Sequence, residues 1–317
     1  MKDGMNDNKN EATSSQNYRN EAISSRSIRE ALVEASSFLV EQGVADGRSD
    51  AELLMQHMLG WERSRLLLDW HELFPGKYLE EWFELLSRRG TGEPVQYMLG
   101  EQEFYGLRFE VNPAVLIPRP ETELLVEAIM KRGREIWGNR TATSQGPLVV
   151  DIGTGSGAIA TSLAVFNPDW QIIACDLSPR AIEVASRNVR KNDVGDRITF
   201  HQGDLLEPVI KLGIRVDILV SNPPYIPSSD IEGLQREVRE HEPVLALDGG
   251  DDGLFCYRRM LAQMERLPSV PSLIGFEVGF GQAQDVAKLM KNCGWWKRVE
   301  IILDYSGIER HVIGLID

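Results

Sequence analysis

The 317-residue sequence contains little cysteine and little histidine. Its three cysteines, Cys175, Cys256 and Cys293, are odd in number and form no CxxC pair, which indicates reduced thiols of a cytosolic protein rather than a disulfide framework. Its five histidines are scattered without the spacing of metal ligands, so we predict no metal site.

Long apolar runs are missing as well. No stretch reaches the roughly 18 apolar residues that a membrane span requires, so we expect no contact with a membrane. The first residues lack a basic stretch followed by an apolar one, so we expect no secretory signal and a cytoplasmic location.

Positive charge is in deficit. Asp and Glu number 48 against 34 Lys and Arg, which gives a formal net charge of −14 at pH 7. A surface of this sign repels nucleic acid unless a local basic patch intervenes, and it favours a protein or small-molecule partner. The hydrophobic content of 42% is ordinary for a globular protein, and 317 residues suffice for one large or two medium domains.

The N-terminal part of the chain divides into a polar segment and a helical one. Residues 1–27 are rich in Asn, Ser, Glu and Lys, carry equal numbers of acidic and basic side chains, and are predicted to be a disordered tail. Residues 28–97 place apolar side chains at helical spacing and are predicted to form a small domain of four or five helices. Within it, Ser49 and Glu52 match a capping box, which predicts a helix start there.

The remainder of the chain changes from a hairpin to alternating strands and helices. Residues 98–118 place Gly106 between two short strand-like runs and are predicted to be a β-hairpin linker. Residues 119–317 alternate apolar runs with helical patterns, which predicts a doubly wound α/β fold around a parallel sheet, closed by a terminal antiparallel hairpin. The predicted strands are residues 148–151, 171–176, 198–202, 216–221, 273–278, 298–303 and 310–315, and two predicted helices are residues 178–192 and 282–292.

A glycine-rich turn follows the first of these strands. Glycines there let the backbone approach a ligand closely and open a helix whose N-terminus faces it. The spacing is GxGxG, with Ala158 where a dinucleotide-binding fingerprint has its third Gly or Ala, so the turn alone does not separate a nicotinamide enzyme from an S-adenosylmethionine enzyme. The predicted cofactor-binding residues of the turn are Gly153, Thr154, Gly155, Ser156 and Gly157.

Acidic residues end the next two strands. Asp176 is placed to accept hydrogen bonds from ribose hydroxyls, and its alternative role is to support the helix that starts at Ser178-Pro179. Asp204 is a candidate acceptor for an adenine amino group, and Leu205 is a candidate to pack on the ring. A plain polar turn is the alternative for both residues.

The most unusual motif is Asn222-Pro223-Pro224-Tyr225, which ends the fourth strand. Two successive prolines fix φ and remove two backbone N–H donors. The corner therefore presents a side-chain amide, carbonyl acceptors and an aromatic ring, which suits a planar NH2-bearing group, although a proline-rich turn ending a strand has the same pattern. In a doubly wound sheet the first and fourth strands are neighbours at the switch point, which predicts that this corner lies beside the glycine-rich turn. A hydride-transfer enzyme has no evident use for such a corner.

The glycine-rich turn and the Asn-Pro-Pro-Tyr corner together resemble class I S-adenosylmethionine methyltransferases that modify amide or exocyclic amine nitrogens. Further segments resemble the protein-(glutamine-N5) methyltransferase family, HemK/PrmC, over about residues 28–317. The tail over residues 1–27 is not part of this resemblance. The segments that carry it are Gly92-Glu93-Pro94-Val95-Gln96-Tyr97, Glu103-Phe104-Tyr105-Gly106, Ile117-Pro118-Arg119-Pro120-Glu121-Thr122-Glu123 and Gly249-Gly250-Asp251-Asp252-Gly253-Leu254.

The resemblance implies a seven-stranded class I methyltransferase sheet and S-adenosyl-L-methionine as cofactor. It implies that the chain methylates the glutamine of the Gly-Gly-Gln motif in bacterial peptide chain release factors, and that residues 28–97 help to hold the release factor. We expect a monomer without a direct nucleic-acid partner. A sister class that methylates a glutamine of a ribosomal protein shares both motifs. A nucleic-acid amino methyltransferase uses similar corners, although the net charge of −14 argues against it.

An amide nitrogen is a poor nucleophile, because its lone pair is delocalised into the carbonyl. Placement therefore matters more than acid–base chemistry, and no general base is evident in the sequence. We predict that Asn222 Oδ1 and the Pro223 carbonyl accept the two amide hydrogens, which makes the nitrogen more electron-rich as charge develops. Tyr225 is predicted to pack against the flat amide, and Pro224 completes the catalytic corner.

Three residues are weaker candidates. Phe104 is a candidate wall of the methionine or glutamine pocket, with a place in the hairpin core as its alternative. Arg119 and Glu121 are candidates to border the methionine end of the cofactor, with simple roles at a helix start as the alternative.

Overall fold

The structure, a computed structural model, describes residues 26–138 and 146–316. The chain divides into two compact units between Leu99 and Gly100, close to the predicted boundary after residue 97. Residues 1–25 of the predicted tail lie outside the described part. Among the helices of the described ranges, none is both long and apolar enough to cross a membrane.

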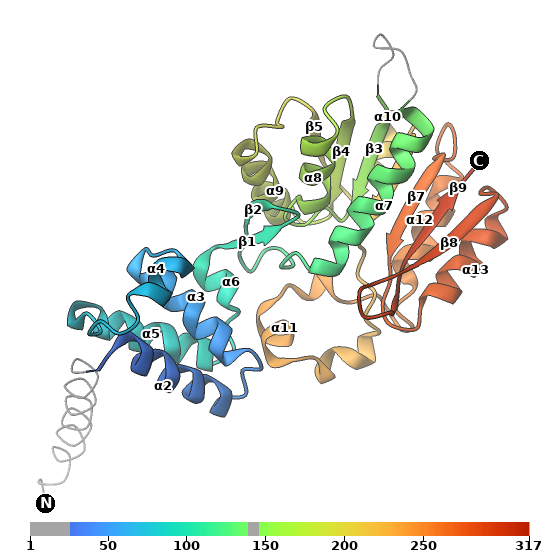
Figure 1. Cartoon of the computed structure of the whole chain (residues 1–317). Coiled ribbons are helices and arrows are strands. Elements are labelled where there is room, and N and C mark those ends of the chain that lie inside the picture. Colours follow the sequence, from blue (N-terminus) through green and yellow to red (C-terminus); the bar gives the residue numbers. More distant parts are fainter. Residues whose placement is uncertain (1–25, 139–145, 317) are drawn as a thin grey trace, which may run out of the picture. The chain divides into compact units, whose positions relative to one another are not determined.

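The first unit is helical, as the sequence pattern predicts (Figure 1). The helix α2 (Ile28–Glu41) begins with a capping box, in which the Glu30 N–H donates to Ser27 Oγ and the Glu30 carboxylate accepts from the Ser27 N–H. The largest side chain in the core of this unit is Trp82, which packs against Phe74. The elements are α2 (Ile28–Glu41), α3 (Gly47–Leu59), α4 (Arg63–Leu68), η1 (Gly76–Tyr78), α5 (Leu79–Gly90) and α6 (Val95–Leu99).

The predicted helix start at Ser49 is wrong, because α3 begins at Gly47. Close packing explains the difference. A Cβ atom at Gly47 would lie 3.1 Å from the Leu39 side chain, so a glycine there lets α3 lie against α2. Tertiary packing therefore outweighs the local capping pattern, and Ser49 lies inside the first turn of the helix.

The second unit opens with the hairpin of β1 (Glu101–Phe104) and β2 (Leu107–Glu110), which are antiparallel. Both residues of its turn have positive φ, 51° at Tyr105 and 73° at Gly106. Positive φ at both central positions is the requirement of a type I′ turn, whose twist matches that of the flanking strands.

A seven-stranded sheet forms the centre of this unit, in the order β5-β4-β3-β6-β7-β9-β8. The first five strands in sequence are parallel, and β9 is antiparallel to both of its neighbours. The predicted doubly wound sheet with a terminal antiparallel hairpin is thereby confirmed, including the adjacency of the first and fourth predicted strands. The strands are β3 (Leu148–Ile152), β4 (Gln171–Asp176), β5 (Ile198–Gln202), β6 (Ile218–Ser221), β7 (Leu273–Glu277), β8 (Arg298–Leu303) and β9 (Glu309–Leu315).

Helices cover both faces of the sheet, because successive residues of each buried strand are apolar and point to opposite sides. Val149 packs with α7, α8 and the β1–β2 hairpin on one face, whereas Val150 packs with α12 and α13 on the other. Both side chains are fully buried. The remaining elements are α7 (Pro120–Trp137), α8 (Ala158–Phe166), α9 (Pro179–Lys191), α10 (Glu207–Leu212), η2 (Ser228–Gly233), α11 (Arg236–His241), η3 (Val244–Ala246), α12 (Phe255–Met264) and α13 (Ala283–Cys293).

Candidate active site

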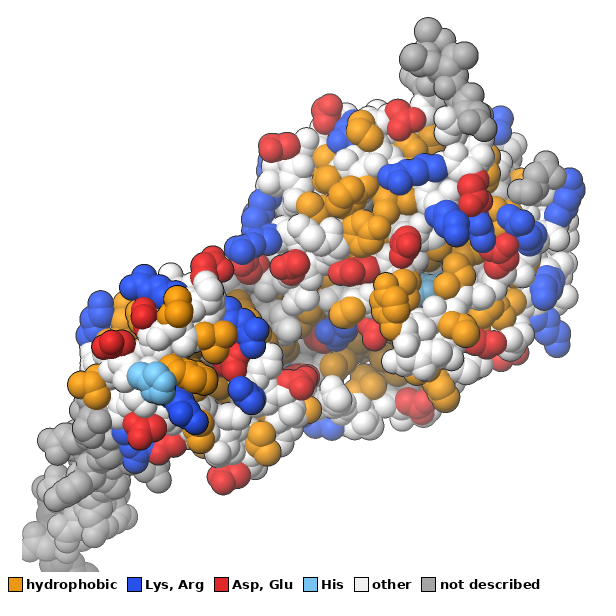
Figure 2. All heavy atoms as spheres, in the orientation of Figure 1, with side chains coloured by type: hydrophobic (Ala, Val, Ile, Leu, Met, Phe, Trp, Pro, Cys, Tyr) orange, Lys and Arg blue, Asp and Glu red, His pale blue; other side chains and the backbone are white. Residues whose placement is uncertain are grey.

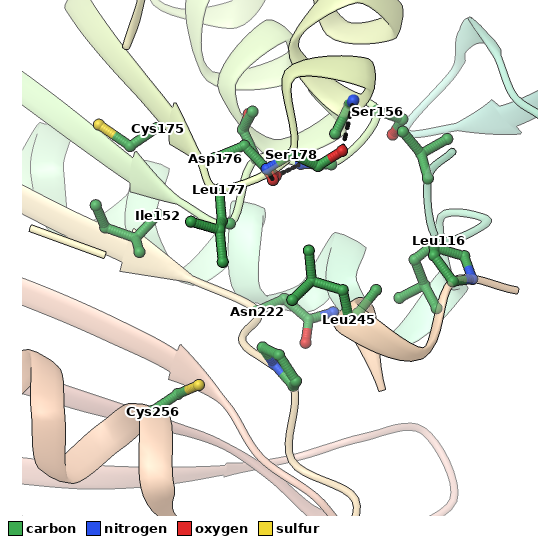
Figure 3. A pocket seen from close by; sticks show the side chains of 18 of the residues that line it. Leu116, Ile152, Ser156, Cys175, Asp176, Leu177, Ser178, Asn222, Leu245 and Cys256 are labelled. Carbon is green, nitrogen blue, oxygen red and sulfur yellow. Dashed lines mark hydrogen bonds between the residues drawn. The ribbon is translucent and has the colours of Figure 1, made fainter. Parts of the chain in front are cut away.

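A cavity of about 290 Å³ lies at the carboxyl ends of β3, β4 and β6, within the second unit. Crevices at this edge of a doubly wound sheet are the usual ligand sites of such folds. Loop residues 114–119 and 243–248 supply further parts of its wall. Figure 3 shows Asp176 and Ser178 on one side of the cavity, with Asn222 and Leu245 on the other.

The glycine-rich turn forms one wall of this cavity. Gly153 and Gly155 have φ of 70° and 55°, a conformation that residues with a Cβ rarely adopt. The N–H groups of Gly153 and Thr154 both donate to the Cys175 carbonyl, at 2.9 and 3.0 Å, which ties the turn to β4. Four of the five predicted residues line the cavity, namely Gly153, Thr154, Gly155 and Ser156.

Gly157 has a different role from the rest of the turn. It is the N-cap residue of α8, with φ of 79°, and it does not line the cavity. A Cβ atom there would lie 3.1 Å from the Ala185 Cβ atom of α9. The glycine therefore permits α8 and α9 to approach closely behind the cavity wall.

Asp176 joins the turn to the next helix. Its Oδ2 atom accepts from the Gly155 N–H at 2.9 Å, and its Oδ1 atom accepts from the Ser178 N–H at 2.8 Å. Burial raises the pKa of Asp176, and these N–H groups oppose that rise. Ser178 Oγ in turn accepts from the Ala181 N–H and caps α9, as predicted. Asp176 thus supports the start of α9 and also lines the cavity.

A second carboxyl group lies directly beneath the turn. Asp151 is fully buried, and its Oδ2 atom accepts from the Thr154 hydroxyl at 2.7 Å. Burial raises its pKa to about 7, and the hydrogen bond from Thr154 opposes the rise. This contact holds Thr154 in place at the cavity wall.

Asp204 and Leu205 both line the cavity after β5, but Asp204 has a partner that sequence reasoning missed. Both of its carboxylate oxygens accept from the guanidinium group of Arg259, which also lines the cavity. Arg259 stands 5.3 Å from the centre of the Phe255 ring. Leu205 has φ of 52°, a strained conformation for a residue with a branched side chain.

The Asn-Pro-Pro-Tyr corner faces the cavity with only part of its residues. Asn222 and Pro224 line the cavity, whereas Pro223 is buried and Tyr225 lies outside the lining. Burial raises the pKa of Tyr225 to about 12, and its carbonyl accepts from Gln282 Nε2 at 2.8 Å. The structure therefore brings Asn222 to the glycine-rich turn but does not bring the Tyr225 ring to the cavity wall.

Asn222 is held by a hydrogen-bonded chain. Its Nδ2 atom donates to Thr122 Oγ1 at 3.1 Å, and the Thr122 hydroxyl donates to Glu277 Oε2 at 2.7 Å. Within residues 26–138 and 146–316, no hydrogen bond reaches Asn222 Oδ1, which remains an acceptor at the cavity. Sequence reasoning missed Thr122 and Glu277 as site residues. An acidic residue at the carboxyl end of the fifth predicted strand is the signal that could have found Glu277.

Of the three weaker candidates for the site, only one lines the cavity. Phe104 is buried against Phe109 in the core, with the ring centres 6.0 Å apart, so it takes its alternative place in the hairpin core. Arg119 lines the cavity and pairs with the buried carboxylate of Glu242, another residue that sequence reasoning missed. Glu121 does not line the cavity.

The face of the molecule that Figure 2 shows carries charges of both signs. On the face that Figure 2 shows, Lys and Arg side chains are interspersed with Asp and Glu side chains and with apolar ones. Such a mixed surface lacks the basic stripe that is typical of nucleic-acid binding on the face shown.

Comparison with known proteins gives two family matches and a set of whole-chain relatives. Residues 30–100 match the PrmC N-terminal domain, and residues 121–249 match the methyltransferase small domain. The release factor glutamine methyltransferase of Bacillus subtilis is 40% identical over 292 residues, which cover 92% of this chain and 98% of the relative. That of Bacillus anthracis is 39% identical over 92% of this chain and 99% of the relative.

Among solved structures, the hMettl16 catalytic domain in complex with the MAT2A 3′UTR hairpin 6 is similar with a TM-score of 0.51. It is 16% identical and the match covers 74% of this chain and 82% of that chain, so this likeness concerns the fold, which is that of a class I methyltransferase. The relatives near 40% identity extend over both units and over the residues of the cavity. This chain therefore belongs to the release factor glutamine methyltransferase family and is a methyltransferase.

Proposed function

We propose that this chain transfers a methyl group from S-adenosyl-L-methionine to the side-chain amide nitrogen of the glutamine in the Gly-Gly-Gln motif of peptide chain release factors. The names of the relatives support the class of substrate. The observation that carries the proposal is the placement of Asn222, whose Oδ1 atom remains an acceptor in the cavity that the glycine-rich turn and Asp176 also line.

The residues of the cavity fit an adenosine-type ligand. Gly153 and Gly155 leave the backbone of the turn open to close approach, and the Asp176 carboxylate offers an acceptor for ribose hydroxyls. Leu205 supplies an apolar wall, and Asp204 with its partner Arg259 supplies polar groups beside it. When bound here, S-adenosylmethionine supplies a methyl group that its sulfonium has already activated.

The protein's own contribution is to hold the glutamine amide. Asn222 Oδ1 accepts one amide hydrogen, and we propose that the carbonyl of the adjoining Pro223, a residue outside the cavity lining, accepts the other. Together the two acceptors orient the nitrogen and favour the growth of positive charge on it. Pro224 restricts the backbone of the corner and forms part of the wall. Tyr225, whose ring lies outside the cavity lining, acts by supporting the corner from behind.

The helical unit is proposed to bind the body of the release factor, as the match of residues 30–100 to the PrmC N-terminal domain supports. Binding energy gained far from the reacting nitrogen then positions the glutamine in the cavity. We further propose that the enzyme acts as a monomer in the cytoplasm, where release factors are found, and has no direct nucleic-acid partner.

The test is mass spectrometry of a purified release factor after incubation with this enzyme and S-adenosylmethionine. We expect the mass of one methyl group on the peptide that contains the Gly-Gly-Gln motif. The control is the same release factor with alanine in place of that glutamine. Methylation of the control, or an unmodified wild-type peptide beside a methylated ribosomal protein, would refute the proposed substrate.

A further inference from the structure

Three polar side chains from distant parts of the sequence form a directed series of hydrogen bonds that starts at the cavity wall, where Asn222 and Thr122 lie, and ends at Glu277 behind it. Asn222 follows β6, Thr122 lies in the first turn of α7, and Glu277 ends β7. The bonds run from Asn222 Nδ2 to Thr122 Oγ1 at 3.1 Å and from the Thr122 hydroxyl to Glu277 Oε2 at 2.7 Å. Thr122 is 5% exposed and Glu277 is 1% exposed, so water does not replace these bonds.

We propose that Glu277, acting through Thr122, sets the orientation of the Asn222 amide and keeps its oxygen turned toward the substrate. Glu277 and Thr122 are then positioning residues, because the group that touches the glutamine amide is Asn222. This inference rests on the proposed function, which gives Asn222 the role of acceptor.

The direction of these hydrogen bonds follows from which of the three side chains can donate and which can only accept. An ionised carboxylate only accepts hydrogen bonds, so the Thr122 hydroxyl must give its single hydrogen to Glu277. The Thr122 oxygen can then only accept, and the only donor on the Asn222 side chain is its NH2 group. The NH2 group therefore faces Thr122, and Oδ1 is left for the cavity.

Protonation of Glu277 reverses the direction of these hydrogen bonds. A neutral carboxyl group can donate to the Thr122 oxygen, which frees the Thr122 hydrogen for Asn222 Oδ1. The amide can then turn over and present its NH2 group to the cavity. Two NH2 groups, one from Asn222 and one from the substrate glutamine, would face each other without an acceptor, and the site would lose its hold on the amide.

The surroundings of Glu277 make both forms accessible near neutral pH. Burial raises its pKa to about 7, and the hydrogen bond from Thr122, the charge of Arg310 in β9 and a further hydrogen bond from the Asn222 side chain oppose the rise. Glu121 of α7 adds to the rise. His311 of β9 has Nε2 3.9 Å from Glu277 Oε2, but burial lowers the His311 pKa to about 4, so it brings no positive charge at neutral pH.

Two tyrosines complete these surroundings. The Tyr257 hydroxyl of α12 donates to the Glu277 backbone carbonyl at 2.7 Å, and Tyr225 of the corner is the other phenol nearby. Burial holds the pKa of both phenols above the ordinary value, so both are neutral where Glu277 titrates. Among the groups around the Glu277 end of these hydrogen bonds, Glu277 is therefore the one that changes charge near pH 7.

The first test compares turnover of Thr122→Val and Thr122→Ser with a release factor as substrate. Valine keeps the shape and removes the hydroxyl, and we expect kcat to fall about ten- to hundredfold with cofactor affinity within about twofold of wild type. Serine keeps the hydroxyl, and we expect it to restore kcat to within about threefold of wild type. The matched control is Thr161→Val in α8, a buried threonine whose hydroxyl has no hydrogen-bond partner among the described residues, and we expect this variant to retain wild-type turnover.

The second test follows the charge on Glu277. We expect kcat of the wild type to fall as pH drops through about 7, and Glu277→Gln to lack this acidic limb and to be slower than wild type at pH 8. In 1H–15N spectra, the side-chain NH2 signals of Asn222, assigned by their loss in Asn222→Ala, should shift with a midpoint near pH 7 in the wild type. Those signals should not titrate in Glu277→Gln.

The outcomes separate this inference from the proposed function. A wild-type enzyme that methylates no release factor refutes the proposed function, while the NH2 titration still decides the link between Glu277 and Asn222. Equal losses in Thr122→Val and Thr122→Ser, wild-type turnover in Thr122→Val, or an unchanged Asn222 titration in Glu277→Gln would each overturn the inference.

Discussion

The Arg119 guanidinium donates to the buried carboxylate of Glu242, although 123 positions separate the two residues in the sequence. The same carboxylate accepts from the Ile117 N–H at 3.2 Å. Loop residues 114–119 and segment 243–248 both line the cavity, so Glu242 fastens two parts of its wall to each other.

We expect Glu242→Ala to weaken binding of S-adenosylmethionine about tenfold or more. The substitution leaves Arg119 without its buried partner and releases the loop that carries Ile117. Calorimetric titration of the cofactor measures the effect. Glu240→Ala, at a nearby exposed position, serves as the control and should bind as tightly as wild type, and equal affinities in the two variants would contradict the role of Glu242.

Asp176→Ala should weaken cofactor binding about tenfold or more, because hydrogen bonds to a charged group contribute about 1.5–3 kcal/mol each. The structure adds a second reason, since the carboxylate also orders the Gly155 and Ser178 N–H groups. The measurement is again calorimetry, with circular dichroism to establish that the variant is folded. A folded variant with unchanged affinity would remove Asp176 from the cofactor site.

Asn222→Ala should lower turnover by about 10²–10³ with little change in cofactor affinity, because it removes an acceptor that matters most as charge develops on the nitrogen. Asn222→Asp keeps an acceptor but adds a negative charge in the cavity, so we expect retained or tighter cofactor binding with impaired methylation. Methyl transfer to a release factor is the assay. Wild-type turnover in Asn222→Ala would mean that the corner is only a turn.

A chain that begins at Gly100, the first residue of the second unit, tests the proposed role of the helical unit. If the helices bind the release factor, this shorter chain should still bind S-adenosylmethionine but methylate the full-length release factor at least about tenfold less efficiently. Catalytic efficiency is compared with that of the full chain at equal cofactor saturation. Equal efficiencies would assign the helices to a role other than substrate binding.

The raised pKa of Glu277 predicts how stability depends on pH. The folded state binds the Glu277 proton more tightly than the unfolded state does, with a pKa of about 7 against 4.5. This stabilisation is fully present below pH 4.5 and is lost as pH rises through about 7. Relative to Glu277→Gln, the wild type should therefore lose about 2 kcal/mol of unfolding free energy between pH 5.5 and pH 8.

Urea denaturation of both proteins at the two pH values measures this difference. Asp151 titrates in the same direction, but it is present in both proteins and cancels in the comparison. Glu265→Gln, at an exposed position in the same unit, is the control and should follow the wild type. A constant difference between wild type and Glu277→Gln across this range would contradict the raised pKa.

Much of the fold could be predicted because its strands are short apolar runs bounded by turn-forming residues. The strands at 171–176, 198–202 and 298–303 have the predicted bounds, and the predicted cap of α9 at Ser178 is present. The fourth strand begins two residues later than predicted, at Ile218. Asp217 there uses its carboxylate to accept from the Leu148 N–H, which a hydropathy pattern does not show.

Only those residues of the site that belong to a local sequence motif could be predicted. A short sequence motif predicts the glycine-rich turn and another predicts Asn222, and the sheet topology brings the two motifs together. The pairs Asp204–Arg259 and Thr122–Asn222 join residues 55 and 100 positions apart, so their contacts depend on how α12 and α7 pack on the sheet. The position of the Tyr225 ring likewise depends on its packing beside Gly279, which no local pattern reveals.

The order of the last two strands has a consequence for how the chain folds. β8 precedes β9 in the sequence, yet only β9 pairs with β7. β8 therefore joins the sheet only through β9, which is its one neighbour there. Without β9, the edge of β7 would present unpaired N–H and C=O groups beside the apolar side chains of Leu273 and Phe276. We therefore expect damage to β9, which covers this edge, to favour wrong strand pairing and aggregation more than damage to the outer strand β8.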